Sequence, residues 1–122
     1  MNIIHMRWIA TLVVLVSISL FVAGCTTTSG TNNKGYSKDA MDSNSKGFDL
    51  YMKGDYTDAL AAFNQSIAVD PSFTKAWNNK GLTLVKMERY TEAAECFTRT
   101  LELDPAYPGA KENLDAVLAK TK

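Results

Sequence analysis

The sequence has little of the chemistry on which enzymes and metal sites depend. Its 122 residues include one histidine, His5, which lies close to the start of the chain, and only two cysteines. Neither cysteine has a second thiol, a histidine or a carboxylate at the spacing of metal ligands. Glycine-rich phosphate loops and the GxSxG and HExxH motifs are also missing. We therefore expect no catalytic residue, no metal site and no cofactor, and we predict that this chain is not an enzyme.

An excess of charge of one sign is missing too. Thirteen Lys and Arg residues balance thirteen Asp and Glu residues. A nucleic-acid-binding protein carries a field of basic side chains that attracts the phosphates, and this balance gives none. We therefore expect no nucleic acid among the partners. Two cysteines are too few for a disulfide framework. We interpret Cys96 as a small, partly buried side chain, and the alternative is a redox-active thiol.

The N-terminal end carries a long hydrophobic run. Residues 8–23 hold no charged side chain, follow Arg7 and lead into Gly24. A cationic start, an apolar centre and small residues before a cleavage point are typical of a secretory signal. Sixteen residues at about 1.5 Å each cover about 24 Å of a hydrocarbon core of about 30 Å, which is short for a permanent span. We interpret residues 1–24 as an export signal, with an uncleaved signal anchor as the alternative.

Residues 22–25, Val-Ala-Gly-Cys, resemble the lipobox of bacterial and some archaeal lipoproteins. The resemblance implies that Cys25 is the lipidated first residue of the mature protein, whereas an ordinary signal peptide would be cut nearby without lipid. Two acyl chains keep a protein on a membrane, and one chain gives only marginal binding. Residues 25–39 are rich in Thr, Ser, Gly and Asn, so we expect a flexible tether. Each interpretation predicts a location in the cell envelope, on the extracytoplasmic side of the membrane.

The remainder of the chain repeats itself at an offset of 34 residues. Glycine, aromatic, alanine and Asp-Pro positions recur at this spacing: Gly47 and Gly81, Tyr56 and Tyr90, Ala59 and Ala93, Phe63 and Phe97, and Asp70-Pro71 and Asp104-Pro105. The period and the order of these residues resemble the tetratricopeptide repeat (TPR), which is a pair of antiparallel helices. The resemblance implies an all-α fold, with two helix-turn-helix hairpins stacked right-handed and a C-terminal capping helix. We expect a domain over residues 40–122, with repeats at 40–73 and 74–107 and the capping helix at 108–120.

The same residues explain physically why two helices would pack here. Gly81 and Ala93 lack bulk and let two backbones approach, while the ring of Phe97 fills the space beside them. Each proline disfavours the α conformation at the aspartate before it, so we expect each hairpin to stop at Asp70 and Asp104. Thr74 is placed to cap the helix that follows.

The repeat also predicts a binding surface. In this family the first helices of successive hairpins line a concave face, and amide and aromatic side chains there would hold an extended peptide. The resemblance places a peptide-binding groove at Asn44, Phe48, Tyr51, Asn78, Asn79, Leu82, Val85 and Glu112. The alternative is that these residues are ordinary solvated helix positions.

One subclass of the family clamps the C-terminal carboxylate of its ligand with Lys, Asn and Arg side chains at five positions. In this sequence those positions hold Asn44, Phe48, Asn79, Gly109 and Asn113. Only Asn79 agrees with the clamp, and its cationic members are missing. The sequence therefore disfavours a ligand that is held by a terminal carboxylate.

Two functions remain open at this point. The first is a membrane-tethered protein–protein interaction module that scaffolds or recruits another envelope or extracytoplasmic protein. The second is a self-associating structural unit that forms homodimers at the membrane surface, because two hairpins and a cap form a small core that a second copy would enlarge. The identity of the partner does not follow from the repeat, because such folds serve many functions.

Overall fold

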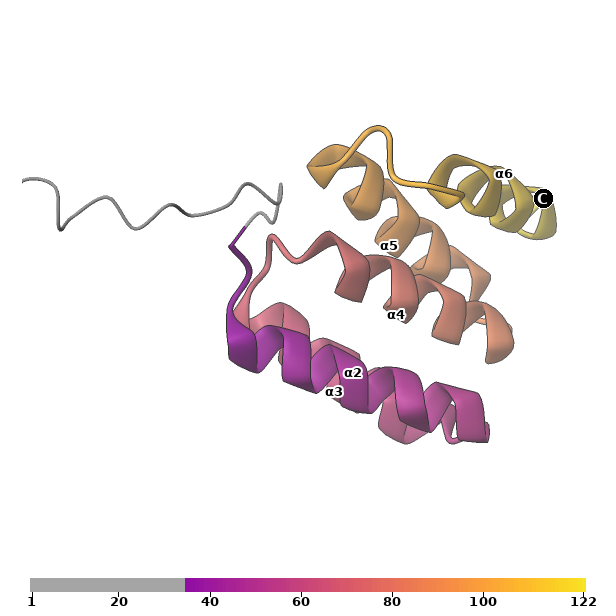
Figure 1. Cartoon of the computed structure of the whole chain (residues 1–122). Coiled ribbons are helices and arrows are strands. Elements are labelled where there is room, and N and C mark those ends of the chain that lie inside the picture. Colours follow the sequence, from indigo (N-terminus) through magenta and orange to yellow (C-terminus); the bar gives the residue numbers. More distant parts are fainter. Residues whose placement is uncertain (1–34) are drawn as a thin grey trace, which may run out of the picture. The chain divides into compact units, whose positions relative to one another are not determined.

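A computed structural model describes residues 35–122 and places five α-helices in them, without any strand in this part of the chain. Figure 1 labels the helices α2 (Lys38–Lys53), α3 (Tyr56–Val69), α4 (Thr74–Lys86), α5 (Tyr90–Leu103) and α6 (Ala110–Lys120). The predicted all-α fold is confirmed. None of these helices is long and apolar enough to cross a membrane. The predicted export signal, Cys25 and most of the predicted tether lie outside the described residues.

The helices form two hairpins and a final single helix. Helix α2 packs on α3, α4 packs on α5, and α6 lies against α5. Contacts of α3 and α2 with α4 join the two hairpins. In Figure 1 the chain turns back on itself after α2 and again after α4, so the two helices of each hairpin run in opposite directions. The first helices of the two hairpins, α2 and α4, also contact each other.

Both hairpins turn at a residue with a left-handed backbone. After α2 this residue is Gly54, with a φ of 86°, and its amide donates a hydrogen bond of 3.0 Å to the Tyr51 carbonyl. After α4 the matching residue is Glu88, with a φ of 59°. A residue with a side chain adopts this conformation at a cost of roughly 1–2 kcal/mol that glycine avoids. The second turn therefore keeps the geometry of the first without the residue type that favours it.

A glycine faces a phenylalanine ring inside each hairpin. A Cβ atom at Gly47 would lie 2.7 Å from Cε1 of Phe63, and a Cβ atom at Gly81 would lie 2.7 Å from Cε1 of Phe97. Both rings are fully buried, so they have no open space into which to move. Only a residue without a side chain lets the two helices of a hairpin approach this closely.

Helices α3 and α5 both end immediately before an Asp-Pro pair. Asp70 and Asp104 have extended backbones, as expected before proline. Their carboxylates fix the turn that follows: Asp70 Oδ1 accepts a bond of 3.0 Å from the Ser72 amide, and Asp104 Oδ1 accepts one of 3.1 Å from the Ala106 amide. The predicted stops of both hairpins are confirmed.

The predicted cap at Thr74 was wrong. Thr74 is the first residue of α4, the cap position is Phe73, and the Thr74 hydroxyl donates to the Ser72 carbonyl at 3.4 Å instead. The reason lies in the packing of Phe73, whose ring is buried with Ala40 and Ala76. The register of α4 thus follows the burial of this ring, which outweighs the hydrogen bond that a capping hydroxyl would make.

The larger of the two core clusters lies in the second hairpin. Leu84, Ala93, Cys96 and Phe97 are buried there, and α6 adds Val117 to the same cluster. This contribution confirms that α6 packs as the final helix of the array.

We predict that Gly81→Ala destabilises the domain. Alanine in place of a helical glycine would by itself favour folding by about 1 kcal/mol, but the added methyl group would overlap the Phe97 ring. We expect a net loss of about 1–2 kcal/mol in the free energy of unfolding, measured by urea denaturation.

Gly35→Ala is the matched control, because nothing lies within 4 Å of a Cβ atom at Gly35. That variant should unfold at the same urea concentration as the unchanged chain. Equal or greater stability of Gly81→Ala would contradict the close approach of the two helices.

Candidate functional site

The predicted groove residues lie on the first helix of each hairpin, α2 and α4, and on the final helix α6. Their side chains range from exposed to buried. Phe48 and Glu112 are exposed. Tyr51, Leu82 and Val85 are half-buried, and the last two pack against the core. The three asparagines are buried, at Asn44, Asn78 and Asn79.

Aromatic side chains form the exposed part of this surface. Phe48 keeps 47% of its surface exposed, and its ring stacks on Tyr51 with 6.4 Å between the centroids and 21° between the planes. Tyr51 in turn contacts Tyr56, at 5.6 Å. Met52, which we did not predict, is 68% exposed one turn after Phe48. Its spacing of four residues from Phe48 was a signal that could have found it.

Two of the predicted groove amides bond to each other. Asn79 Nδ2 donates to Asn44 Oδ1 at 3.0 Å, and the two side chains keep only 8% and 4% of their surface exposed. This bond joins α4 to α2 across the two hairpins. The backbone carbonyl of Asn79 also accepts a buried bond of 2.8 Å from the Thr83 hydroxyl. Asn44 and Asn79 therefore form the floor of the surface and fix the spacing of its two helices.

Asn78 differs from its neighbour. It keeps 8% of its surface exposed, and its Oδ1 atom is buried without a hydrogen-bond partner. A buried acceptor that makes no hydrogen bond costs roughly 1–3 kcal/mol relative to one that does.

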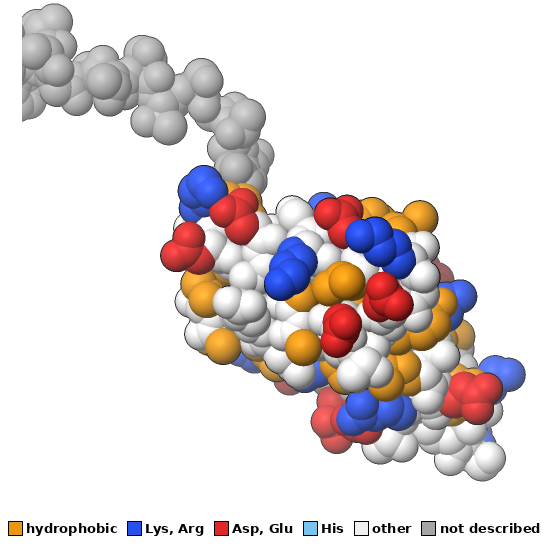
Figure 2. Space-filling model, turned by 90° about the horizontal axis from the view of Figure 1, so that it is seen from below, with side chains coloured by type: hydrophobic (Ala, Val, Ile, Leu, Met, Phe, Trp, Pro, Cys, Tyr) orange, Lys and Arg blue, Asp and Glu red, His pale blue; other side chains and the backbone are white. Residues whose placement is uncertain are grey.

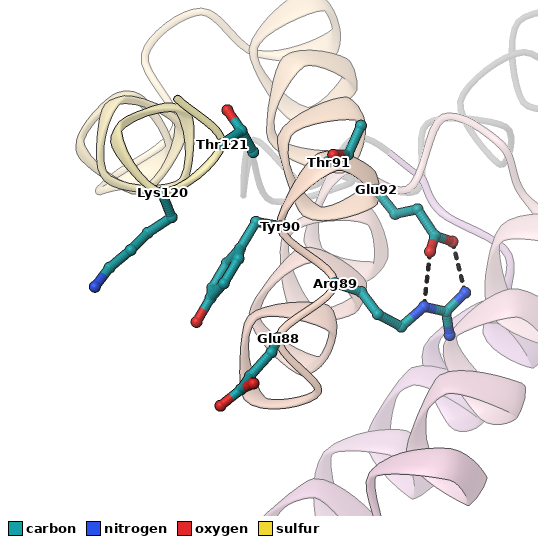
Figure 3. A pocket seen from close by; sticks show the side chains of 7 residues that line it. All are labelled: Glu88, Arg89, Tyr90, Thr91, Glu92, Lys120 and Thr121. Atoms are coloured by element: carbon teal, nitrogen blue, oxygen red, sulfur yellow. Dashed lines mark hydrogen bonds and ion pairs between the residues drawn. The ribbon is translucent and has the colours of Figure 1, made fainter.

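A polar hollow of about 340 Å³ lies beside the turn that joins α4 to α5. Figure 3 shows that Tyr90, Glu88 and Lys120 project to one side of it, while Arg89 and Glu92 face each other on the other side. Arg89 bonds Glu92 at 2.6 and 2.7 Å, and this pairing raises the pKa of Arg89 and lowers the pKa of Glu92. Arg89 and Glu92 therefore neutralise each other's charge on this side of the hollow.

An apolar hollow of about 570 Å³ lies between α5 and α6. Trp77, Ala94, Leu114 and Leu118 line it, and Leu118 keeps 43% of its surface exposed. The Trp77 indole donates a bond of 2.9 Å to the Pro71 carbonyl, which fixes the ring at this position. Helix α6 therefore leaves an open apolar surface at its end of the array.

Charge and metal ligands offer no second site in the described part of the chain. Figure 2 shows basic and acidic side chains interspersed with hydrophobic ones, without an area of one sign on that face. Within residues 35–122, no three His, Cys, Asp or Glu side chains lie together as metal ligands would.

Cys96 is buried in the larger core cluster as a free thiol. Burial raises the pKa of this thiol to about 11. A buried thiol of raised pKa is a poor nucleophile, because the thiolate is the reactive form. This environment is that of a core side chain.

Family models identify the repeat. A model described as the tetratricopeptide repeat matches residues 74–107, and one described as a TPR repeat matches residues 47–88. The chain therefore carries tetratricopeptide repeats. No match was found among the curated proteins.

Solved TPR domains share this fold. The second TPR of Spaghetti (RPAP3), bound to an HSP90 peptide, superposes with a TM-score of 0.67 at 21% identity, over 69% of this chain and 78% of that one. The second TPR domain of human RPAP3, in complex with an HSP70 peptide, gives 0.62 at 23% identity, over 65% and 66%. The TPR2B domain of yeast Sti1, in a complex with pHsp70, gives 0.67 at 21% identity, over 70% and 68%. At these identities the likeness shows the fold.

We predict that Cys96 is alkylated slowly in the folded protein. Its raised pKa leaves about 100-fold less thiolate at pH 8 than a thiol of pKa 9.0 would have. Iodoacetamide labelling, followed by mass spectrometry of the peptide that contains Cys96, should be at least 100-fold slower in buffer than in urea.

The same pKa shift makes stability depend on pH. The folded state favours the neutral thiol, so the contribution of Cys96 to the free energy of unfolding is complete below pH 9 and falls as the pH rises from about 9 to about 11.

The alkylation experiment has a clear contrary outcome. If iodoacetamide labelled Cys96 at equal rates in buffer and in urea, the thiol would be accessible in the folded protein, which would contradict its burial.

Proposed function

We propose that this protein is a membrane-tethered protein–protein interaction module that recruits or positions another envelope protein through its concave helix face. The stacked rings of the exposed Phe48 and the half-buried Tyr51 carry the proposal. Rings that remain accessible on a surface whose floor is rigid are typical of the anchor sites of protein interfaces. The TPR domains of similar fold support it, because two of them are solved with peptides bound.

The ligand of this chain differs from those peptides. The HSP90 peptide of the Spaghetti complex is SRMEEVD, which is acidic at its C-terminal end. Of the five positions that clamp such a terminus in one subclass, none holds Lys or Arg here, and Asn79 is already bonded to Asn44. A carboxylate at this place would lose its hydration without gaining a charged partner. We therefore assign the site to another class of protein segment.

The tether is the second part of the proposal. The sequence pattern around Cys25 supports a lipid anchor, and the polar segment after it supports a flexible link to the repeats. A lipid anchor and a flexible link together would hold the binding face close to the outer side of a membrane. The partner would then be an exported or membrane-bound protein.

Self-association is the second candidate function. The open hollow that Leu114 and Leu118 line favours it, because a second copy that packed there would bury apolar surface that α6 leaves exposed. The product would be a homodimer at the membrane surface.

We predict that Phe48→Ala lowers capture of the partner about tenfold. The half-exposed ring contributes contact area to a ligand but little to the core, so its loss should weaken binding without unfolding the domain. The measurement is affinity capture from solubilised membranes of the source cells, quantified by mass spectrometry.

Gln65→Ala on α3 is the control, since Gln65 is exposed on the second helix of the first hairpin. A protein that the unchanged chain and Gln65→Ala retain, and that Phe48→Ala loses, locates the site. Equal retention by all three chains would place binding elsewhere.

We predict that Cys25→Ser releases the protein from membranes. Serine has no thiol to receive the lipid, so the chain should move from the detergent phase to the aqueous phase in Triton X-114 partitioning. Cys96→Ser is the control and should stay in the detergent phase. A Cys25→Ser chain that remains in the detergent phase would favour an uncleaved hydrophobic anchor.

We predict that Leu118→Lys leaves a monomer if self-association uses the hollow between α5 and α6. Sedimentation velocity of residues 35–122 at micromolar concentration would then show dimers of the unchanged chain, and monomers of Leu118→Lys. Monomers of the unchanged chain over the whole concentration range would remove this candidate.

A further inference from the structure

The first and the last helix of the array both expose apolar side chains. On α2, Phe48 and Met52 lie one turn apart and keep 47% and 68% of their surface exposed. On α6, Leu118 keeps 43% exposed in the wall of the apolar hollow between α5 and α6. Helices α2 and α6 lie at opposite ends of the array (Figure 1). The chain therefore carries an apolar projection at one end and an apolar hollow at the other.

The hollow is continuous with the core of the second hairpin. Trp77, Ala94 and Leu114 line the hollow and also pack against the buried cluster. In the repeat, Leu118 stands 34 residues after Leu84. Leu84 is fully buried among the side chains of α5, whereas Leu118 is left half-covered. An apolar side chain that entered the hollow from outside would therefore extend an existing core.

Charged side chains beside the projection match those beside the hollow. Asp49 and Lys53 on α2 are four residues apart, and each directly follows one of the two projecting side chains. Glu95 and Arg99 on α5 line the hollow at the same spacing. Both pairs run from acidic to basic along their helices. Only an antiparallel docking of α2 on α5 therefore brings opposite charges together at both places.

These charges are available for such a contact. Within residues 35–122, Lys53 and Glu95 form no ion pair, and both side chains are exposed. Arg99 bonds Glu102 at 2.8 Å through one nitrogen, and its guanidinium has further N–H donors. Lys53 of one copy would face Glu95 of the next.

We propose that the hollow between α5 and α6 receives Phe48 and Met52 of a second copy of this chain, whose α2 lies antiparallel to α5. This inference rests on the self-association considered above and changes its symmetry. A projection that fits a hollow elsewhere on the same molecule makes a heterologous contact. The product is a head-to-tail row instead of a closed pair, and the copy at one end of the row keeps its Phe48 ring free for another partner.

A single contact of this kind is small. Nine residues line the hollow, whereas a stable interface uses roughly 20–30 residues on each partner. One contact is therefore weak in solution. On the tether proposed above, the copies would share one membrane surface, and the higher effective concentration there favours the row.

The test is sedimentation velocity of residues 35–122 up to several hundred micromolar, since residues 34–122 form one compact unit. The unchanged chain should give dimers, trimers and larger species in growing proportion. Met52→Lys changes the projection and Leu118→Lys the hollow, and each should remain monomeric because it would bury a lysine in an apolar contact. Gln65→Lys is the control on the exposed side of α3 and should assemble as the unchanged chain does.

Mixing the two variants distinguishes a head-to-tail contact from a twofold one. An equimolar mixture of Met52→Lys and Leu118→Lys has one intact projection and one intact hollow, so it should form a dimer and nothing larger. If Met52→Lys alone assembled as the unchanged chain does, the hollow would pair without α2. That result would overturn the head-to-tail contact and leave self-association standing.

A charge exchange tests the orientation without altering an apolar residue. Lys53→Glu should weaken assembly about two- to fivefold, which is the range of an exposed ion pair. Glu95→Lys in the same chain should restore it. Because both residues are exposed, this exchange also decides the question if a lysine variant of the apolar residues lowers the midpoint of thermal unfolding.

The remaining outcomes separate the inference from the functions proposed above. A mixture that stays monomeric, or a charge exchange that does not restore assembly, would contradict the antiparallel head-to-tail contact. An unchanged chain that is monomeric at every concentration would remove both this inference and self-association. Capture of another membrane protein is measured separately, so the interaction module stands after either result.

Discussion

The contact between a glycine and a buried phenylalanine ring sets the geometry of both hairpins. At Gly47 and Gly81 any side chain would overlap Phe63 or Phe97, so each pair of helices lies as close as two backbones with one ring between them allow. The same spacing in both hairpins makes the second a copy of the first. Contacts between the hairpins then bring their first helices, α2 and α4, together.

The surface that these two helices form combines a rigid floor with accessible rings. The buried bond between Asn44 and Asn79 holds the helices at a fixed distance, and the Phe48 ring lies exposed one turn away. Because this floor is already ordered, the surface loses little entropy when a ligand binds. The exposed ring offers the ligand apolar contact area. The arrangement suits recognition of a protein segment.

The sequence predicted the fold more fully than the site. The 34-residue period, the small and aromatic positions and the Asp-Pro pairs predicted the hairpins and their ends, because each follows from the local chain or from one helix face. The pairing of Asn44 with Asn79 and the acceptor of Asn78 did not follow, since periodicity places an amide on a face but not the partner it meets across helices. Thr74 failed as a cap for a related reason, because the burial of Phe73 set the start of α4.

The most direct test of this account is a two-dimensional ¹H–¹⁵N NMR titration of residues 35–122 with the protein that the unchanged chain retains and Phe48→Ala loses. The account predicts shifts confined to α2 and α4, with the largest at the backbone amides of Phe48 and Tyr51. Shifts centred on Leu114 and Leu118 between α5 and α6, with α2 unaffected, would contradict it and place recognition at the other end of the array.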